Sequence, residues 1–326
     1  MPEVKKTPNM GMWVFGVVLI VVIVFVALTL MLVYSQADPV TQETQITNVA
    51  PSIGTIYISD SQYGESHDYV TSPTEPEPGI DLEPGGTQTV HINGRVTDAN
   101  GVADAANWTL VGKFYRTSVT SSCSADDNNC YEFFSWDCTT NVLDSTTFQY
   151  DCPIALQYYA DATDAVSDYS GDKWTPFVYV SDGGLNDFGI GSYQPDMNTL
   201  LALTIPDTID YGTLANDTAT SFPSGTTEYQ TYVQQGNDEA DVEVSGNTLN
   251  CDAGTIPVGN TQWSLTGVNY DDPGTNDLTG TPTTAAINVG YRTNGVVNKD
   301  LYWNIYVPFN VSGSCSGSAT MTAIAH

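Results

Sequence analysis

The segment Asp300 to Val307, which reads DLYWNIYV, alternates apolar and mixed side chains in the manner of a β-strand. Successive side chains of a strand point to opposite faces of its sheet. One face would carry Leu301, Trp303, Ile305 and Val307, and the other would carry Tyr302, Asn304 and Tyr306. The segment therefore predicts a strand with one face in a hydrophobic core.

Short runs of the same kind fill the C-terminal part of the chain. They cover residues 200–205, 209–214, 227–234, 240–245, 261–265, 285–291, 300–307 and 319–325. So many short alternating runs in succession predict a β-sandwich or jelly roll over residues 198–326.

The preceding part of the chain predicts another β-sandwich, over residues 51–190. Strands are expected at 52–59, at 87–97, at 108–119 with a break or bulge near Gly112, and at 172–182. Bulky residues that such a core needs are Phe133, Phe134, Trp136, Phe148, Tyr150, Leu156, Tyr158 and Tyr159, and Trp174 lies at the entrance of the last of these strands. The Gly- and Asp-rich residues 183–199 form the expected boundary between the two domains. The fold class is therefore all-β, with two tandem Ig-like or jelly-roll-like sandwiches, although the Cys…Trp…Cys spacing of Ig domains is not met.

An apolar run near the N-terminus predicts a transmembrane helix. Residues 12–33 (MWVFGVVLIVVIVFVALTLMLV) lie in a stretch without a charge between Lys6 and Asp38. As a helix they would extend roughly 33 Å, enough for a bilayer core of about 30 Å. Lysines before the run and acids after it place residues 1–11 in the cytoplasm, the span at 12–34 and the rest outside. The polar residues 35–50 read as a stalk.

Three fates of this segment stay open. The run is longer than the roughly 7–15 residues of a secretory signal, which favours an uncleaved signal anchor. Ser35-Gln36-Ala37 would still permit cleavage after Ala37. A pilin-type leader is the third reading, but the glutamate that this class usually carries early in the helix is missing.

The charge balance restricts the partners. The chain has 38 acids, 8 bases and a formal net charge of −30. Such a field repels nucleic acid and anionic lipid. It suits a hydrated surface layer that would attract divalent cations.

All six cysteines follow the apolar run, and an even number in an exported chain favours disulfides over a metal site. If the two domains are independent, Cys251 pairs with Cys315. The other four cysteines allow three connectivities, of which Cys123–Cys130 with Cys138–Cys152 is the most local.

Residues 48–326 resemble a class of known surface proteins. The phrases that carry the likeness are NVAPSIGTIYISD, IDYGTL, LNCDAGTIPVGNTQWSL and DLYWNIYVPFNVSGSCSGSATMTAIA. They are similar to those of membrane-tethered, two-module cell-surface proteins of archaea and uncultured small-genome bacteria, with Ig-like β-sandwich modules. The resemblance implies location and fold and carries no biochemical activity.

No motif of an enzyme is present in the sequence. The three histidines, His67, His91 and His326, are far apart, and no His-Glu-x-x-His or phosphate-binding loop occurs. Gly313 to Gly317 (GSCSG) imitates a nucleophile elbow, but no helix and no partner histidine motif follow it. We expect a protein without enzymatic activity.

Two acidic turns are candidate calcium sites. Oxygen ligands cluster at Asp98, Asn100 and Asp104, and again at Asp271, Asp272, Asn276 and Asp277. Turn chemistry explains the same residues, because Asp and Asn are favoured in turns for their backbone geometry. Sequons for N-glycosylation occur at Asn107, Asn216 and Asn310.

Taken together, the sequence predicts a membrane-anchored extracellular surface protein with a structural, adhesive or coat role. The alternative is a pilus-like filament subunit, assembled through the N-terminal helix or by strand addition from residues 38–50. A segment donated as a strand alternates apolar residues that fill a groove of the neighbouring subunit. In this segment only Val40, Ile46 and Val49 would do so, so the alternation is weak. A surface hydrolase ranks last. Expected partners are the membrane through residues 12–34, a further copy of the chain, or a surface glycan or protein.

Overall fold

The computed structural model describes residues 10–34, 47–64, 79–222, 229–293 and 295–326. The chain divides into two compact units, Met1–Thr47 and Asn48–His326. Each unit is described by itself below.

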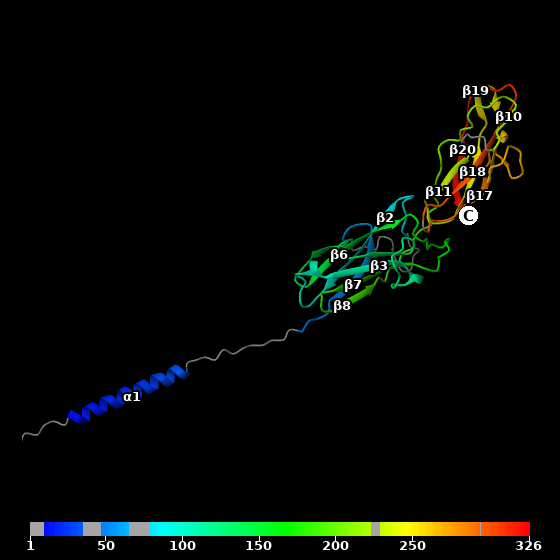
Figure 1. Ribbon diagram of the computed structural model, residues 1–326. Coiled ribbons are helices and arrows are strands. Elements are labelled where there is room, and N and C mark those ends of the chain that lie inside the picture. The colour runs from blue at the N-terminus through cyan, green and yellow to red at the C-terminus, as the bar shows by residue number, and fades with distance from the viewer. Residues whose placement is uncertain (1–9, 35–46, 65–78, 223–228, 294) are drawn as a thin grey trace, which may run out of the picture. The chain divides into compact units, whose positions relative to one another are not determined.

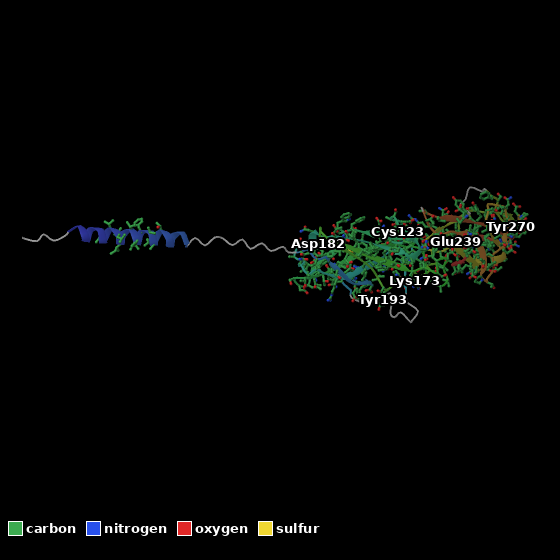
Figure 2. The ribbon with its side chains drawn as sticks, turned by 90° about the horizontal axis from the view of Figure 1, so that it is seen from below. Cys123, Lys173, Asp182, Tyr193, Glu239 and Tyr270 are labelled. Carbon is green, nitrogen blue, oxygen red and sulfur yellow. A yellow bond between two sulfur atoms is a disulfide. The ribbon has the colours of Figure 1, made fainter. Side chains whose placement is uncertain are left out.

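In the first unit, described residues 10–34 form the helix α1 (Met10–Tyr34), and its side chains are described for residues 16–29 (Figure 2). Thr29 satisfies its hydroxyl within the helix by donating to the carbonyl of Phe25 at 2.8 Å. Within the part of the chain that the structure describes, no helix combines the length and the hydropathy required to cross a membrane. The membrane span at residues 12–34 stays a prediction.

The second unit consists of antiparallel strands, which confirms the all-β fold class (Figure 1). Its first eight strands are β1 (Ser52–Ser59), β2 (Thr87–Thr97), β3 (Thr109–Arg116), β4 (Cys130–Phe133), β5 (Thr139–Val142), β6 (Thr147–Gln157), β7 (Trp174–Ser181) and β8 (Asn186–Ile190). They are followed by β9 (Leu203–Thr204), β10 (Thr218–Ala219), β11 (Tyr229–Gln234), β12 (Ala240–Gly246), β13 (Leu249–Ala253), β14 (Thr255–Ile256), β15 (Thr261–Ser264), β16 (Asn276–Asp277), β17 (Thr283–Val289), β18 (Asn298–Val307), β19 (Ser312–Ser316) and β20 (Ala319–Ala325). Short 3-10 helices occur at Ala105–Asn107, Thr117–Val119 and Val258–Asn260.

Two four-stranded sheets, ordered β1-β2-β6-β5 and β4-β3-β7-β8, enclose the first core. Val90, Ile92 and Val96 of β2 are fully buried, as alternation along the strand requires. Trp174 lies at the start of β7 with no exposed surface, and its ring lies 5.2 Å from that of Phe114. Burial of each such side chain stabilises the fold by about 1.5–3 kcal/mol.

The remaining strands form three sheets around separate cores. Their orders are β16-β15-β18-β11-β9 with β10 also paired to β18, β17-β12-β20, and β14-β13-β19. The main core contains Tyr232, Val242, Ala285, Leu301 and Trp303, and a smaller one contains Ile256, Ile305, Val307 and Val311.

Hydrogen bonds link the first core to the later strands. Asn128 donates from Nδ2 to the carbonyls of Tyr159 and Arg292, at 2.9 and 2.8 Å. Asn237 donates to the carbonyl of Ala160 at 3.0 Å. The guanidinium of Arg292 lies over the ring of Tyr159, 4.3 Å from its centroid.

Several details of the predicted strands are wrong. The expected break at Gly112 is absent from β3, whose pairing with β4 and β7 runs through Gly112 in register. A glycine is needed there because a Cβ would lie 2.2 Å from both the Phe133 ring and the Phe177 carbonyl. The predicted strand at 209–214 is also absent, since no strand lies between β9 and β10.

The burial of some side chains does not follow from alternation along the strand. Asn304, which alternation puts on the face opposite Trp303, is buried, because Thr220 donates to its Oδ1 and its Nδ2 donates to the carbonyl of Val268. Trp136 was expected in the core, yet it is 79% exposed, and Phe134 is 36% exposed.

The expected boundary at residues 183–199 carries structure of its own. It includes β8, which pairs with β7, and Met197, which is fully buried in the first core and bridges to Ile80.

Candidate functional site

A tight turn at residues 134–137, called the aromatic turn below, presents two stacked rings. The centroids of Phe134 and Trp136 lie 4.7 Å apart, and the ring planes differ by 14°. The turn closes through two hydrogen bonds, from the Asp137 N–H to the Phe134 carbonyl and from the Phe134 N–H to Asp137 Oδ2, both 2.9 Å long. The rings are therefore held on a short, fixed piece of backbone.

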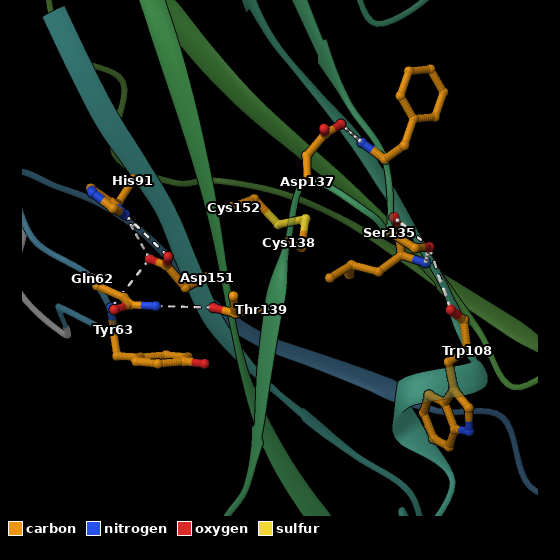
Figure 3. Close-up of a disulfide and its surroundings, with 12 residues drawn as sticks. Gln62, Tyr63, His91, Trp108, Ser135, Asp137, Cys138, Thr139, Asp151 and Cys152 are labelled. Atoms are coloured by element: carbon orange, nitrogen blue, oxygen red, sulfur yellow. Dashed lines mark hydrogen bonds and ion pairs between the residues drawn. A yellow bond between two sulfur atoms is a disulfide. The ribbon is translucent and has the colours of Figure 1, made fainter.

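Neighbouring groups anchor the aromatic turn on both sides (Figure 3). Ser135 Oγ accepts from the Leu110 N–H at 2.8 Å and donates to the Leu110 carbonyl at 3.0 Å. Cys138, directly after the turn, forms a disulfide with Cys152 of β6.

A depression of about 340 Å³ lies beside the turn. Its lining consists of Tyr131, Glu132, Phe133, Asp137, Pro153, Ile154 and Ala155. Burial raises the pKa of Tyr131, whose hydroxyl accepts from the Gln157 N–H at 2.9 Å and donates to the Asp127 carbonyl. Glu132 forms an ion pair of 3.0 Å with Lys113. The depression thus combines apolar walls with two carboxylates.

A larger groove of about 980 Å³, the C-terminal groove, lies among the later strands. Its apolar lining includes Ile209, Leu214, Leu249, Ile256, Leu278, Ile305, Val311 and Met321. Its rim includes β19 and the start of β20, each an edge strand of its sheet. The segment between β9 and β10 lies along the groove without forming a strand. Gln230 Nε2 holds this segment by donating to the carbonyls of Pro206 and Thr208. Edge strands present backbone N–H and C=O groups to which a further strand could pair.

The three disulfides are the pairs that the sequence analysis favours. Cys123 is bonded to Cys130, Cys138 to Cys152, and Cys251 to Cys315. All three lie in the unit Asn48–His326.

The first acidic turn directs its oxygens to partners within the chain. Asp98 Oδ1 accepts from the Asn100 N–H, and Asn100 Oδ1 accepts from the Val49 N–H, both at 2.6 Å. Asp104 Oδ1 accepts from Trp108 Nε1 at 3.2 Å. These three side chains serve different hydrogen bonds.

In the second acidic turn an amide lies between two carboxylates. Gln262 Nε2 donates to Asp271 Oδ1 and to Asp277 Oδ1, at 2.7 and 2.8 Å. Asp272 Oδ2 accepts from the backbone and side chain of Asn269, and Asn276 donates to the carbonyl of Gly274. Among the residues described, no group of three or more His, Cys, Asp or Glu is placed to hold a metal ion. Calcium at either turn stays a prediction.

The sequons are at the surface, because Asn107, Asn216 and Asn310 are all exposed. Asn310 adopts a left-handed φ of 63° in the turn before β19. Their glycosylation stays a prediction.

The histidines show no catalytic arrangement in the described part of the chain. His67 lies outside it. His91 Nδ1 lies 2.9 Å from Asp151 Oδ1 (Figure 3), but the nearby hydroxyl of Ser59 is fully buried and donates to the Ser61 carbonyl. His326 Nδ1 lies 3.0 Å from Asp241 Oδ2 at the end of β20. The first four residues of the GSCSG sequence lie in β19, and its Cys315 is engaged in a disulfide.

The aromatic turn is the feature that the sequence analysis missed. The bulky residues around Trp136 predict a position in the core, which the structure does not bear out. The signal that could have found it is the flanking Ser135 and Asp137, since Ser and Asp are typical of turns.

Comparisons with known proteins leave the family of the chain open. No protein-family model matches it, and no curated protein matches it. One solved structure comes from work on "Chaperone-tip adhesin complex is vital for synergistic activation of CFA/I fimbriae biogenesis". It shares 10% identity and a TM-score of 0.24, with 86% of this chain and 92% of that chain covered. A likeness this distant carries no argument about function.

Proposed function

We propose that the protein is a membrane-anchored extracellular surface protein, without enzymatic activity, that acts as a structural or adhesive component. The observation that carries the proposal is the placement of all three disulfides in the unit that follows α1. Disulfides form and persist in oxidising compartments outside the cytosol. A chain that bears them after an apolar run of sequence is suited to the outer side of a membrane.

The anchor in this proposal is residues 12–34. As a helix, the apolar run at residues 12–33 would extend roughly 33 Å, against a bilayer core of about 30 Å. Lys5 and Lys6 precede the helix, and its first and last turns carry no charge. With positive charges on the cytoplasmic side, residues 1–11 stay inside and the stalk at 35–50 leads outward.

The proposal includes two sandwich modules, at residues 51–190 and 198–326. The separate hydrophobic cores support this division, since the strands of the first are β1, β2, β3, β4, β6 and β7 and the others draw on later strands. Met197 and Leu200 pack with the first core, so the junction is a packed one.

Membrane fractionation of cells that make the full-length protein tests the anchor. We expect the protein to stay in the membrane pellet after alkaline carbonate, and protease added outside intact cells to digest the β unit. A variant beginning at Asp38 and carrying a separate export signal is the matched control and should be released. Extraction of the full-length protein by carbonate would contradict the anchor, and protection from external protease would contradict the orientation.

A second candidate function is a subunit of a pilus-like filament assembled by strand addition. The C-terminal groove favours it, because β19 and β20 are edge strands beside an apolar trough. Negative-stain microscopy of the full-length protein in detergent, beside the variant beginning at Asp38, separates the two functions. Discrete particles from both support the tethered protein. Fibres from the full-length protein alone would assign assembly to the helix, and fibres from both would assign it to strand exchange.

Calcium binding is a further proposal for the two acidic turns. Asp271 and Asp277 would have to exchange the Gln262 amide for the ion. The test is the melting temperature with calcium and with EDTA. We expect a higher value with calcium if either turn binds it, and an unchanged value would contradict the proposal.

A further inference from the structure

Among the tryptophans whose side chains the structure describes, Trp136 is the exposed one. Its exposed fraction is 79%, whereas Trp108, Trp174, Trp263 and Trp303 are 6% exposed or less. An indole ring in water leaves a large apolar area uncovered, which is unfavourable unless a ligand covers it. Trp136 is therefore a candidate contact for a ligand.

The ring is held in place before any ligand arrives. Phe134 stacks on it, the turn is closed by the two hydrogen bonds of Asp137, and Ser135 and Cys138 fix the turn to neighbouring strands. A platform that is already ordered loses little conformational entropy on binding. This distinguishes it from an exposed aromatic residue on a flexible loop.

The aromatic turn adjoins a depression that contains polar groups. The depression of about 340 Å³ shares Asp137 with the aromatic turn and adds the carboxylate of Glu132. Carboxylate oxygens accept hydrogen bonds from hydroxyl groups. An apolar plane next to a few acceptors is the composition of a small-molecule site.

We propose that the aromatic turn and the adjoining depression bind a neutral oligosaccharide. A pyranose ring has an apolar face of C–H groups that can lie flat on the Trp136 indole, and hydroxyl groups at its edge that can donate to Asp137 and Glu132. This proposal deepens the adhesive role and rests on the proposed extracellular location, since surface glycans are found there.

The charge of the molecule decides against other ligands that stack on aromatic rings. A formal net charge of −30 repels the phosphate backbone of nucleic acids, whose bases could otherwise stack on the ring, and it repels anionic sugars. A cation could also lie over an indole. Lys113 pairs with Glu132 at 3.0 Å and offsets one of the two carboxylates, which favours a neutral ligand.

The test uses the full-length protein in a detergent without a sugar head group. Cellohexaose, maltohexaose and chitohexaose are titrated while tryptophan fluorescence is recorded, and binding is measured in parallel by calorimetry. We expect at least one hexasaccharide to bind saturably and to shift the emission. Trp136→Ala should weaken that binding at least tenfold and remove the shift in emission. Trp136→Phe should lose less affinity than Trp136→Ala.

Two further variants separate the ligand classes. Phe309→Ala, at a ring that is 66% exposed among the later residues, is the matched control and should bind as the wild type does. Glu132→Gln keeps a hydrogen-bond acceptor without the charge, so a neutral sugar should bind within threefold of the wild type.

Equal binding by Trp136→Ala, or no binding of any of the three sugars to the wild type, would overturn the proposal. A saturable response to tetramethylammonium that Glu132→Gln abolishes would overturn it in favour of a cation. Each of these results can occur while the carbonate and protease tests succeed, so failure of the glycan site is distinct from failure of the proposed location.

Discussion

Cys251 on β13 and Cys315 on β19 are direct cross-strand partners whose Cα atoms lie 3.9 Å apart. Their disulfide joins residues 64 positions apart and fixes one rim strand of the C-terminal groove to its neighbour.

Replacing both residues by alanine should lower the free energy of unfolding by about 4 kcal/mol, because a long loop regains entropy in the unfolded chain. Urea unfolding measures the change. The matched control is Cys123→Ala with Cys130→Ala, whose separation of 7 positions predicts a smaller loss of about 2.5 kcal/mol. A larger loss in the control pair would contradict the loop argument.

Gly112→Ala should destabilise the first core. The new Cβ would lie 2.2 Å from the Phe177 carbonyl, which belongs to the backbone of β7 and has little room to move. Overpacking of this kind costs about 1–3 kcal/mol. Gly171→Ala is the control, since a Cβ there meets nothing within 4 Å. Equal midpoints of chemical unfolding for the two variants would refute the packing argument.

Asp161 should make stability depend on pH. Burial raises the pKa of this carboxyl to about 6, although the guanidinium of Arg116, whose Nε donates to Asp161 Oδ2 at 2.9 Å, acts in the opposite direction. Since the folded pKa exceeds the unfolded value of 3.8, folding takes up a proton. The contribution of Asp161 to stability is therefore full below pH 4 and is lost as the pH rises through 6.

Between pH 4 and 7 the contribution of Asp161 to the free energy of unfolding should fall by up to about 3 kcal/mol. Urea unfolding at several pH values, compared with Asp161→Asn, isolates it from the other carboxylates. Carboxyl NMR titration of the folded protein measures the pKa directly. A titration midpoint of Asp161 at or below the ordinary pKa of 3.8 would show that the ion pair with Arg116 outweighs burial.

Asn128→Ala should weaken the link between the first core and the later strands. Its Nδ2 bonds to the carbonyls of both Tyr159 and Arg292, and loss of a buried pair of this kind costs about 1–3 kcal/mol. If the two proposed modules unfold in separate steps, calorimetry should show those steps further apart in Asn128→Ala than in the wild type. Asn260→Ala, which removes a bond to Tyr306 within one half, is the control and should leave the spacing of the steps unchanged. Unaltered spacing in Asn128→Ala would mean that the two halves unfold independently of this contact.

Local patterns predicted the strands with the clearest alternation. Leu301, Trp303, Ile305 and Val307 are buried, as the sequence of β18 indicates. The extent of β1 and β2 follows from the sequence in the same way. Short pairs such as β10, β14 and β16 were missed, because two residues carry no periodicity.

The exposure of the candidate site does not follow from hydrophobicity along the sequence, for a related reason. Hydrophobicity places Trp136 in a core, but its position depends on the turn that Asp137 closes and on the distant residues Leu110 and Cys152. The C-terminal groove likewise depends on which strands end as sheet edges, and pairing partners are distant in the chain.

The sequence by itself determined the all-β class, the apolar N-terminal run and the acidic surface, because alternation, hydropathy and charge are properties of neighbouring residues. Only the tertiary structure decided that Asn304 is covered, that Gly112 admits no side chain and that Trp136 is left in water. Each of these depends on what packs against a residue from far along the chain. Side-chain environment is a non-local property, and a local pattern does not contain it.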